Sequence, residues 1–214
     1  MFEYPTVEQQ WTQVHLDDLW SQNKLFLSRM LGYNCGPFGT TVPKSDAYII
    51  RPSINFMGMG RNARKRTMFA KVSEDDKYFE EYGMHPSDFW CEIFEGPHLS
   101  VDFHHKQSEL VVLGERDSED PYYKFKKWTK IDEKIGFPPI LHSLSGNYEW
   151  INCEFIGDKL IEVHFHRNPD FKWNNIDAIP VWNGEMEKIK RNLQRDYIFV
   201  EDRDYLREGF FISF

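Results

Sequence analysis

The sequence predicts an α+β protein of two lobes, in which antiparallel sheets are accompanied by flanking helices. Three observations support this prediction. Apolar residues recur at mostly helical spacing over residues 11–31. The middle of the chain is a series of short apolar or alternating runs separated by glycine and proline, as in strands joined by turns. A charged segment over residues 184–197 is typical of a helix, and two short strands follow it, over 197–200 and 209–214.

The first helical region has recognisable ends. Thr6 and Gln9 have the spacing of a capping box, in which two side chains satisfy the free amides of the first turn. A break is predicted near residues 21–23, and Gly32 is expected to end the helix. A short strand over residues 47–50 then leads to Arg51.

Bulk composition limits the classes of function. With 214 residues and 41% hydrophobic content, the chain is expected to form a single domain over residues 1–214. The net charge of −8 argues against general binding of nucleic acid. The sequence has no long apolar run and no signal-peptide pattern, so we expect no membrane partner and a cytoplasmic location. Three widely spaced cysteines, Cys35, Cys91 and Cys153, favour reduced thiols.

The most informative stretch covers residues 150–171. It has the pattern of two strands around a turn at Gly157 and Asp158, with Glu154 in the first strand. Because side chains alternate between the two faces of a strand, the second strand should carry one polar and one apolar face. The polar face holds Glu162, His164 and His166. The apolar face holds Ile161, Val163 and Phe165. The row of polar groups indicates either the floor of a binding site or an ordinary solvated strand face.

A second candidate stretch is the glycine-rich, basic segment over residues 55–66. Gly58 and Gly60 are one residue apart, and Arg61 follows them. Glycine lets backbone amides approach an anion closely, and arginine offers paired donors that suit phosphate. The alternative interpretation is an exposed basic hairpin tip.

Several further elements are predicted along the chain. Residues 73–82 are typical of an acidic helix, and residues 89–103 of a strand, a turn and a second strand. Another strand is predicted over 110–113. The charged residues 117–136 favour loop and helix, and an extended segment is expected to begin at Pro138.

Four stretches, in chain order, resemble motifs of the ATP-grasp superfamily of ATP-dependent carboxylate ligases. QNKLFLSRMLGYNCGPFGTTVP is similar to the family's "DK" helix and the loop after it. IIRPSINFMGMG resembles its phosphate-binding strand and glycine-rich flap. WCEIFEGPHLSVDF is similar to its hinge and strand pair, and INCEFIGDKLIEVHFHRNPDF resembles its metal-binding hairpin. The resemblance covers residues 22–170.

The sequence departs from the family's usual motifs at a few positions. Arg51 stands where lysine is common, His98 replaces a usual glutamate, and His164 stands where asparagine is common. His166 and Arg167 extend the usual E-x-N-x-R ending of the hairpin. Only a helix precedes the "DK" segment, so the resemblance implies a short form without the usual substrate-binding domain.

The resemblance implies that ATP lies between a glycine-flap lobe, residues 43–90, and a metal-hairpin lobe, residues 91–214, after a helical segment over 1–42. Adenine would lie near Glu92 and Glu95. The groups implied to hold the phosphates are Arg51, Gly58, Gly60 and Arg61.

The resemblance also implies roles for the hairpin residues. Glu154 and Glu162 would hold Mg²⁺, for which oxygen ligands are suited. His164 would complete the metal shell or donate to phosphate. Arg167 would stabilise the transferring phosphate or bind the acceptor carboxylate.

The implied activity is an ATP- and Mg²⁺-dependent ligase that activates a carboxylate as an acylphosphate for attack by an amine or another nucleophile. The sequence names neither substrate, which could be small or carried on a peptide or protein. One alternative is a nucleotide-binding module of the same fold without turnover. Another is a transition-metal protein with ligands drawn from Glu162, His104, His105, His164 and His166. We expect Glu162→Gln to abolish ligation and leave the fold intact.

Overall fold

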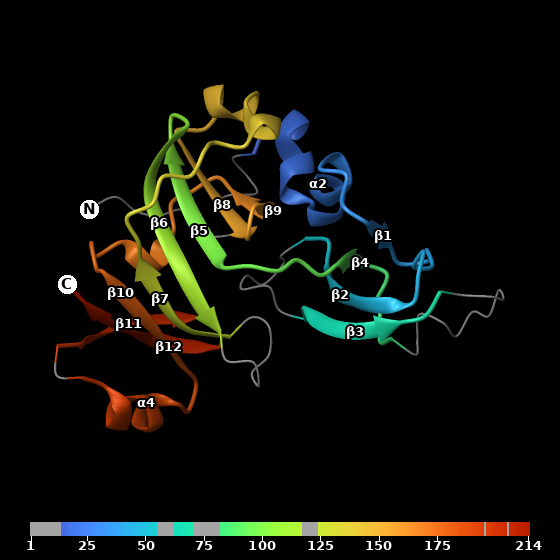
Figure 1. The fold of residues 1–214 in the computed structure, drawn as a ribbon. Coiled ribbons are helices and arrows are strands. Elements are labelled where there is room, and N and C mark those ends of the chain that lie inside the picture. Colours follow the sequence, from blue (N-terminus) through green and yellow to red (C-terminus); the bar gives the residue numbers. More distant parts are fainter. Residues whose placement is uncertain (1–13, 55–61, 71–81, 117–123, 195, 205) are drawn as a thin grey trace.

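The structure is a computed structural model that describes residues 14–54, 62–70, 82–116, 124–194, 196–204 and 206–214. The described chain forms two separate antiparallel sheets, accompanied by short helices (Figure 1). This arrangement confirms the predicted α+β class with antiparallel sheets.

The smaller sheet has four strands in the spatial order β1-β4-β2-β3. Its strands are β1 (Cys35–Pro37), β2 (Asp46–Pro52), β3 (Arg64–Met68) and β4 (Asp88–Glu92). The strand predicted over residues 47–50 is the centre of β2. The sheet has a hydrophobic core of its own, made of Val42, Tyr48, Ile50, Met68, Met84 and Trp90.

The larger sheet has eight strands in the spatial order β11-β12-β10-β7-β6-β5-β8-β9. Its first strands in the chain are β5 (His98–His104), β6 (Gln107–Arg116) and β7 (Phe125–Lys130). The later ones are β8 (Trp150–Ile156), β9 (Lys159–His164), β10 (Asp177–Trp182), β11 (Ile198–Asp204) and β12 (Arg207–Ser213). The strands predicted at the end of the chain correspond to β11 and β12.

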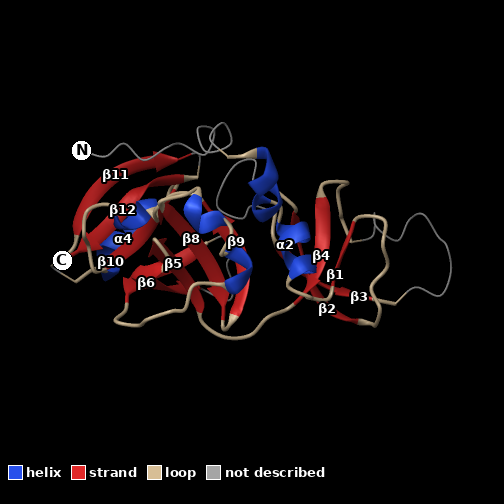
Figure 2. Ribbon diagram, turned by 90° about the horizontal axis from the view of Figure 1, so that it is seen from above, coloured by secondary structure: helices blue, strands red, loops and turns tan. Residues whose placement is uncertain are grey.

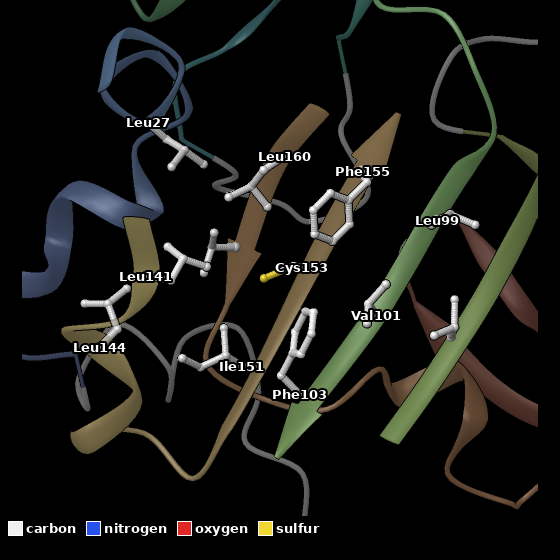
Figure 3. Packing of buried hydrophobic residues seen from close by; sticks show 12 residues of the cluster. Leu27, Leu99, Val101, Phe103, Leu141, Leu144, Ile151, Cys153, Phe155 and Leu160 are labelled. Carbon is white, nitrogen blue, oxygen red and sulfur yellow. The ribbon is translucent and has the colours of Figure 1, made fainter. Parts of the chain in front are cut away.

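The two faces of the larger sheet are buried in different ways. One face of β5, β8 and β9 packs against Leu27, Leu141 and Leu144, which come from helical segments (Figure 3). The opposite face is apolar where it is formed by β6, β7, β10 and β12, with Val112, Trp128 and Phe210 in its core. At β5, β8 and β9 this opposite face carries polar side chains instead. The candidate site lies on this polar part of the sheet.

The first described helices are the 3-10 helix η1 (Leu16–Gln22) and α2 (Lys24–Met30). Between them, the Asn23 side chain accepts a hydrogen bond from the amide of Phe26 at 3.0 Å, so Asn23 caps α2 and causes the predicted break. Gly32 has a φ of 74°, as expected where a helix ends. Helix α2 lies between the two sheets (Figure 2).

The capping box predicted at Thr6 and Gln9 lies outside the described residues, and so does nearly all of the acidic helix predicted over 73–82. The helix predicted over 184–197 is present but shorter, as α4 (Met186–Asn192). In the described ranges, no helix combines the length and the apolar content that crossing a bilayer requires.

The strands predicted within residues 89–103 are present as β4 and β5, which belong to different sheets, so the segment between them crosses from one lobe to the other. Two other predictions about the middle of the chain were wrong. The charged residues 125–130 form strand β7, because pairing with β6 and β10 buries Trp128 and outweighs the lysines around it. The segment expected to be extended after Pro138 forms short 3-10 turns, η2 (Pro139–Leu141) and η3 (Leu144–Gly146).

The crossing segment touches the turn of the β8–β9 hairpin. The Gly157 amide donates to the carbonyl of Pro97 at 2.8 Å. A Cβ on Gly96 would lie 2.7 Å from the Gly157 Cα, and both residues have positive φ. Glycine is therefore required on both sides of this contact.

Candidate functional site

The β8–β9 hairpin forms the floor of the candidate site. Glu154 on β8 pairs with Glu162 on β9, and the next pair is Phe155 with Leu160, so Ile161 is an extra residue in β9. Such a bulge changes the alternation of side chains. As a result Leu160 and Val163 both enter the core, and the prediction that Ile161 shares the face of Val163 was wrong.

The hairpin gathers three potential metal ligands. One ligand atom from each of Glu154, Glu162 and His164 lies within 4.8 Å of the other two. The Nε2 atom of His164 is 3.4 Å from Glu162 Oε1 and 3.9 Å from Glu154 Oε1. Glu154 and Glu162, predicted as metal ligands, are thus brought together, with the imidazole of His164 beside them.

Two buried cations adjoin this group. Lys24 is 3% exposed, and its Nζ lies 3.1 Å from Glu162 Oε2. Burial lowers the pKa of Lys24, although the charge of Glu162 opposes that effect. Arg51 comes from the smaller sheet, and its Nη2 donates to the carbonyl of Ile161 at 3.3 Å. Arg51 therefore contacts the hairpin from the smaller sheet, and its contact with phosphate stays a prediction.

Lys24 was missed as an individual site residue, although the sequence contains a signal. A lysine in the first turn of a helix lies at the positive end of the helix dipole, which is unfavourable without a compensating carboxylate. Lys24 also stands at the lysine of the stretch that resembles the "DK" helix.

Glu154 is held as a carboxylate by its surroundings. Burial acts to raise its pKa, but the hydrogen bond from His98 and the nearby His164 and Lys24 outweigh burial and lower it to about 2. The Nε2 atom of His98 is 3.1 Å from Glu154 Oε2. Glu154 is therefore ionised at neutral pH, which a metal ligand requires.

A second polar network lies beside the metal-ligand group. Asp102 is 1% exposed, and its Oδ1 accepts hydrogen bonds from the Asn152 side chain and the Asn168 amide, each at 2.8 Å. Burial raises the pKa of Asp102 to about 6, although these hydrogen bonds and the charge of Arg167 act in the other direction. The Arg167 Nε is 3.9 Å from Asp102 Oδ2, and the guanidinium lies over the Trp150 ring at 4.4 Å. The network fixes the segment that carries Arg167.

Other predicted site residues lie elsewhere or outside the described residues. The Glu92 carboxylate accepts a hydrogen bond from the Asn34 amide at 2.8 Å, and Glu95 is exposed on the crossing segment. Both stand near the crossing between lobes, and their contact with adenine stays a prediction. Gly58, Gly60 and Arg61 lie outside the described residues.

The histidines proposed for a transition-metal site do not all join the group. His104 pairs with Glu149 and stacks on Trp150, at the far end of β5 from His98, and His105 adjoins it. The His166 ring centroid is 5.2 Å from that of His164, and burial together with the charge of His164 lowers the pKa of His166 to about 4. Within the described residues, the metal-ligand group contains His164 alone of these histidines.

The donor set fits a divalent cation. Two carboxylates supply the oxygen ligands that Mg²⁺ prefers, and the imidazole of His164 adds a nitrogen that Mn²⁺ and other transition metals also accept. Lys24 and Arg51 supply positive charge next to this set, where an anionic ligand of the metal would need it.

Comparisons with known proteins give similar structures only. No protein-family model matches the chain, and no curated protein matches it. Among solved structures, the chain is similar to an L-amino acid ligase from Bacillus licheniformis, at 10% identity and a TM-score of 0.49, over 90% of this chain and 66% of that one. An ATP-grasp superfamily protein from Archaeoglobus fulgidus matches at 13% identity and a TM-score of 0.44, over 92% and 65% of the two chains.

A D-alanine–D-alanine ligase from Bacillus anthracis, solved with ATP, matches at 10% identity and a TM-score of 0.37, over 70% of this chain and 56% of that one. The chain thus spans 56% to 66% of the length of these three proteins. Of these three proteins, the one from Archaeoglobus fulgidus is described as a member of the ATP-grasp superfamily, which is also the superfamily that the four sequence motifs resemble.

Proposed function

We propose that the chain binds Mg-ATP between its two sheets and acts as an ATP-dependent ligase that activates a carboxylate for attack by an amine or another nucleophile. The observation that supports this proposal best is the group of Glu154, Glu162 and His164 with Lys24 and Arg51 beside it. The two carboxylates suit a bound metal ion. The two buried cations beside them suit the negatively charged oxygens of a polyphosphate bound to that metal.

Each residue has a role that its position supports. Glu154 and Glu162 hold the cation, which neutralises phosphate charge when it is bound. Arg51 and Lys24 pair with phosphate oxygens on the side of the smaller sheet. Arg167, held by Asp102 and Trp150, binds the acceptor carboxylate or the transferring phosphate. Catalysis then consists mainly of positioning and charge stabilisation.

The reaction proceeds in two steps on the substrates. An oxygen of the acceptor carboxylate attacks the γ-phosphorus of ATP, the bond to the β-phosphate oxygen breaks, and ADP leaves. The nucleophile then attacks the carbonyl carbon of the acylphosphate, loses a proton, and inorganic phosphate leaves with the C–O electron pair.

Thermal unfolding with ATP, with and without Mg²⁺, tests the proposal, because a ligand of the folded state raises its stability by mass action. We expect a rise in melting temperature that requires both ligands, and ADP release when a suitable carboxylate and amine are added. Nucleotide binding without ADP release across candidate substrates would favour the binding module. A stoichiometric transition metal in protein purified without added metal would favour a metal enzyme.

A further inference from the structure

His98 connects a cation to a predicted metal ligand. Its Nε2 lies 3.1 Å from Glu154 Oε2, and its Nδ1 lies 3.0 Å from Arg116 Nη2. The residue is 7% exposed, so protein groups rather than solvent surround the ring. Both nitrogens of the imidazole are therefore engaged, one on each side.

The chemistry of these partners gives the contacts a direction. A guanidinium can only donate hydrogen bonds, so Nδ1 of His98 must accept from Arg116. The ring proton then resides on Nε2, which donates to the Glu154 carboxylate. Arg116 thus selects the tautomer in which His98 presents an N–H to Glu154.

This contact divides the two oxygens of Glu154 between different tasks. Oε2 accepts from His98, whereas Oε1 is the oxygen that lies 3.9 Å from His164 in the metal-ligand group. A carboxylate held at one oxygen cannot rotate freely, so the other oxygen is presented to the site in a fixed direction.

Two aromatic side chains restrict the orientation of the His98 imidazole. The rings of Phe125 and Trp128 meet it edge to face, with centroids 4.9 and 5.6 Å away. Gly114 lies opposite His98 in the β5–β6 pair, and a Cβ there would be 2.7 Å from each of the two aromatic rings. Glycine at this position lets both rings close over the imidazole.

We infer that His98 is a positioning residue, which holds Glu154 in the orientation that binds the divalent cation, and that Arg116 sets the tautomer that His98 needs for this. The inference rests on the proposed function only in taking Glu154 as a metal ligand. Groups that hydrogen-bond to metal ligands commonly change metal affinity about 10- to 100-fold when they are removed.

The test measures metal affinity rather than turnover. Mn²⁺ is titrated against the full chain with the non-hydrolysable analogue AMP-PNP, and the Mn²⁺ concentration that gives half of the rise in melting temperature is recorded. His98→Leu, which fills the space without polar atoms, is expected to raise this concentration about 10- to 100-fold. His98→Gln, whose amide has one donor and one acceptor side, should stay within about 3-fold of wild type. Arg116→Met should fall between the two.

Visible absorption of bound Co²⁺ supplies a second readout that a purely structural residue would leave unchanged. The spectrum should shift in His98→Leu and be restored in His98→Gln, because the coordination by Glu154 changes and returns. His104→Leu is the matched control, since His104 lies on the same strand and contacts the Glu149 carboxylate at 3.3 Å away from the metal-ligand group. Its Mn²⁺ requirement and Co²⁺ spectrum should equal those of wild type.

The outcomes separate this inference from the proposed function. A His98→Leu variant that melts at a lower temperature but keeps the wild-type Mn²⁺ requirement and Co²⁺ spectrum overturns the inference and leaves the function standing. Equal losses of metal affinity in His98→Gln and His98→Leu also overturn the inference.

If AMP-PNP with Mn²⁺ does not stabilise wild type, the proposed function fails, and the Co²⁺ spectra alone decide the role of His98. If His98→Leu does not fold, the comparison with wild type is made with His98→Gln and Arg116→Met. If wild type shows neither stabilisation by AMP-PNP with Mn²⁺ nor a Co²⁺ spectrum, the proposed function and the inference both fail.

Discussion

Glu162 has a second role besides the proposed one of a metal ligand, because its carboxylate is also the partner of the buried Lys24 ammonium. The sequence pattern placed Glu162 on a polar strand face, from which its replacement would leave the fold intact. The structure revises that expectation, since Glu162 is only 8% exposed. Replacing the Glu162 carboxylate by a neutral group weakens the interaction that stabilises the Lys24 ammonium, which solvent does not reach.

We predict that Glu162→Gln slows any ATP-dependent ligation roughly a thousandfold, which corresponds to about 4 kcal/mol of lost transition-state stabilisation. The variant should also unfold with about 1–3 kcal/mol less free energy, because Lys24 keeps only a neutral acceptor. Product assays and urea unfolding measure the two effects. Glu149→Gln, at an exposed carboxylate, serves as the control and should change neither; near wild-type turnover in Glu162→Gln would exclude the hairpin as the metal site.

Asp102 should give the stability of the protein a distinct pH dependence. Its pKa is about 6 in the folded chain and 3.8 as an ordinary aspartate, so the folded state holds the proton more tightly. Protonated Asp102 therefore contributes fully to the stability of the folded state below pH 4. This contribution is lost as the pH rises through about 6. The difference between these two pKa values corresponds to a change of about 3 kcal/mol in the free energy of unfolding over the full pH range.

Urea unfolding of wild type and Asp102→Asn between pH 4 and 7 measures this effect. The free-energy difference between the two proteins should change across that interval in favour of the variant, because the amide has no proton to lose. A difference that stays constant with pH would show that Asp102 does not titrate in this range.

At the level of single residues, the sequence predicted the groups that share one hairpin and missed those that sheet order brings in. Glu154, Glu162 and His164 could be associated because strand alternation and a two-residue turn act over short distances. Lys24, His98 and Arg116 reach the same place from α2, β5 and β6, and no local pattern specifies which strands are neighbours. Their placement depends on tertiary pairing.

At the level of elements, α2 is a seven-residue helix that depends on its cap and its packing for stability. We predict that Asn23→Ala lowers the free energy of unfolding by about 1 kcal/mol, because the amide of Phe26 loses its acceptor. The same change should weaken stabilisation by Mg-ATP, since α2 carries Lys24. Asn23→Asp keeps an acceptor and should retain wild-type stability in urea unfolding; an equal loss in both variants would contradict the capping role.

The elements that the sequence predicted wrongly share a physical cause. In β7 the lysines suggested a solvated loop or helix, whereas pairing on both sides and burial of Trp128 make the segment a strand. In β9 the bulge at Ile161 shifts the alternation by one residue. Periodicity describes an isolated segment, and in both places the neighbouring strands determine the result.

At the level of the whole molecule, Arg51 links the two sheets through the carbonyl of Ile161. We predict that Arg51→Ala reduces the rise in melting temperature caused by Mg-ATP, because the phosphates lose a bidentate donor from the smaller sheet. Arg203→Ala, at an exposed position on β11, is the control. If ATP stabilised wild type and Arg51→Ala equally, Arg51 would not belong to the nucleotide site.

The same arginine also bears on how the protein behaves at high concentration. Strand β9 is an outer strand of its sheet, and outer strands present backbone groups to which another chain can pair. Here the carbonyl of Ile161 accepts from Arg51, and that of Val163 accepts from the Gln22 side chain at 3.2 Å. These two side chains occupy acceptors that an intermolecular strand would need. Exchanging Gln22 for alanine therefore exposes the edge to self-association, and light scattering during mild heating should detect larger particles than in wild type.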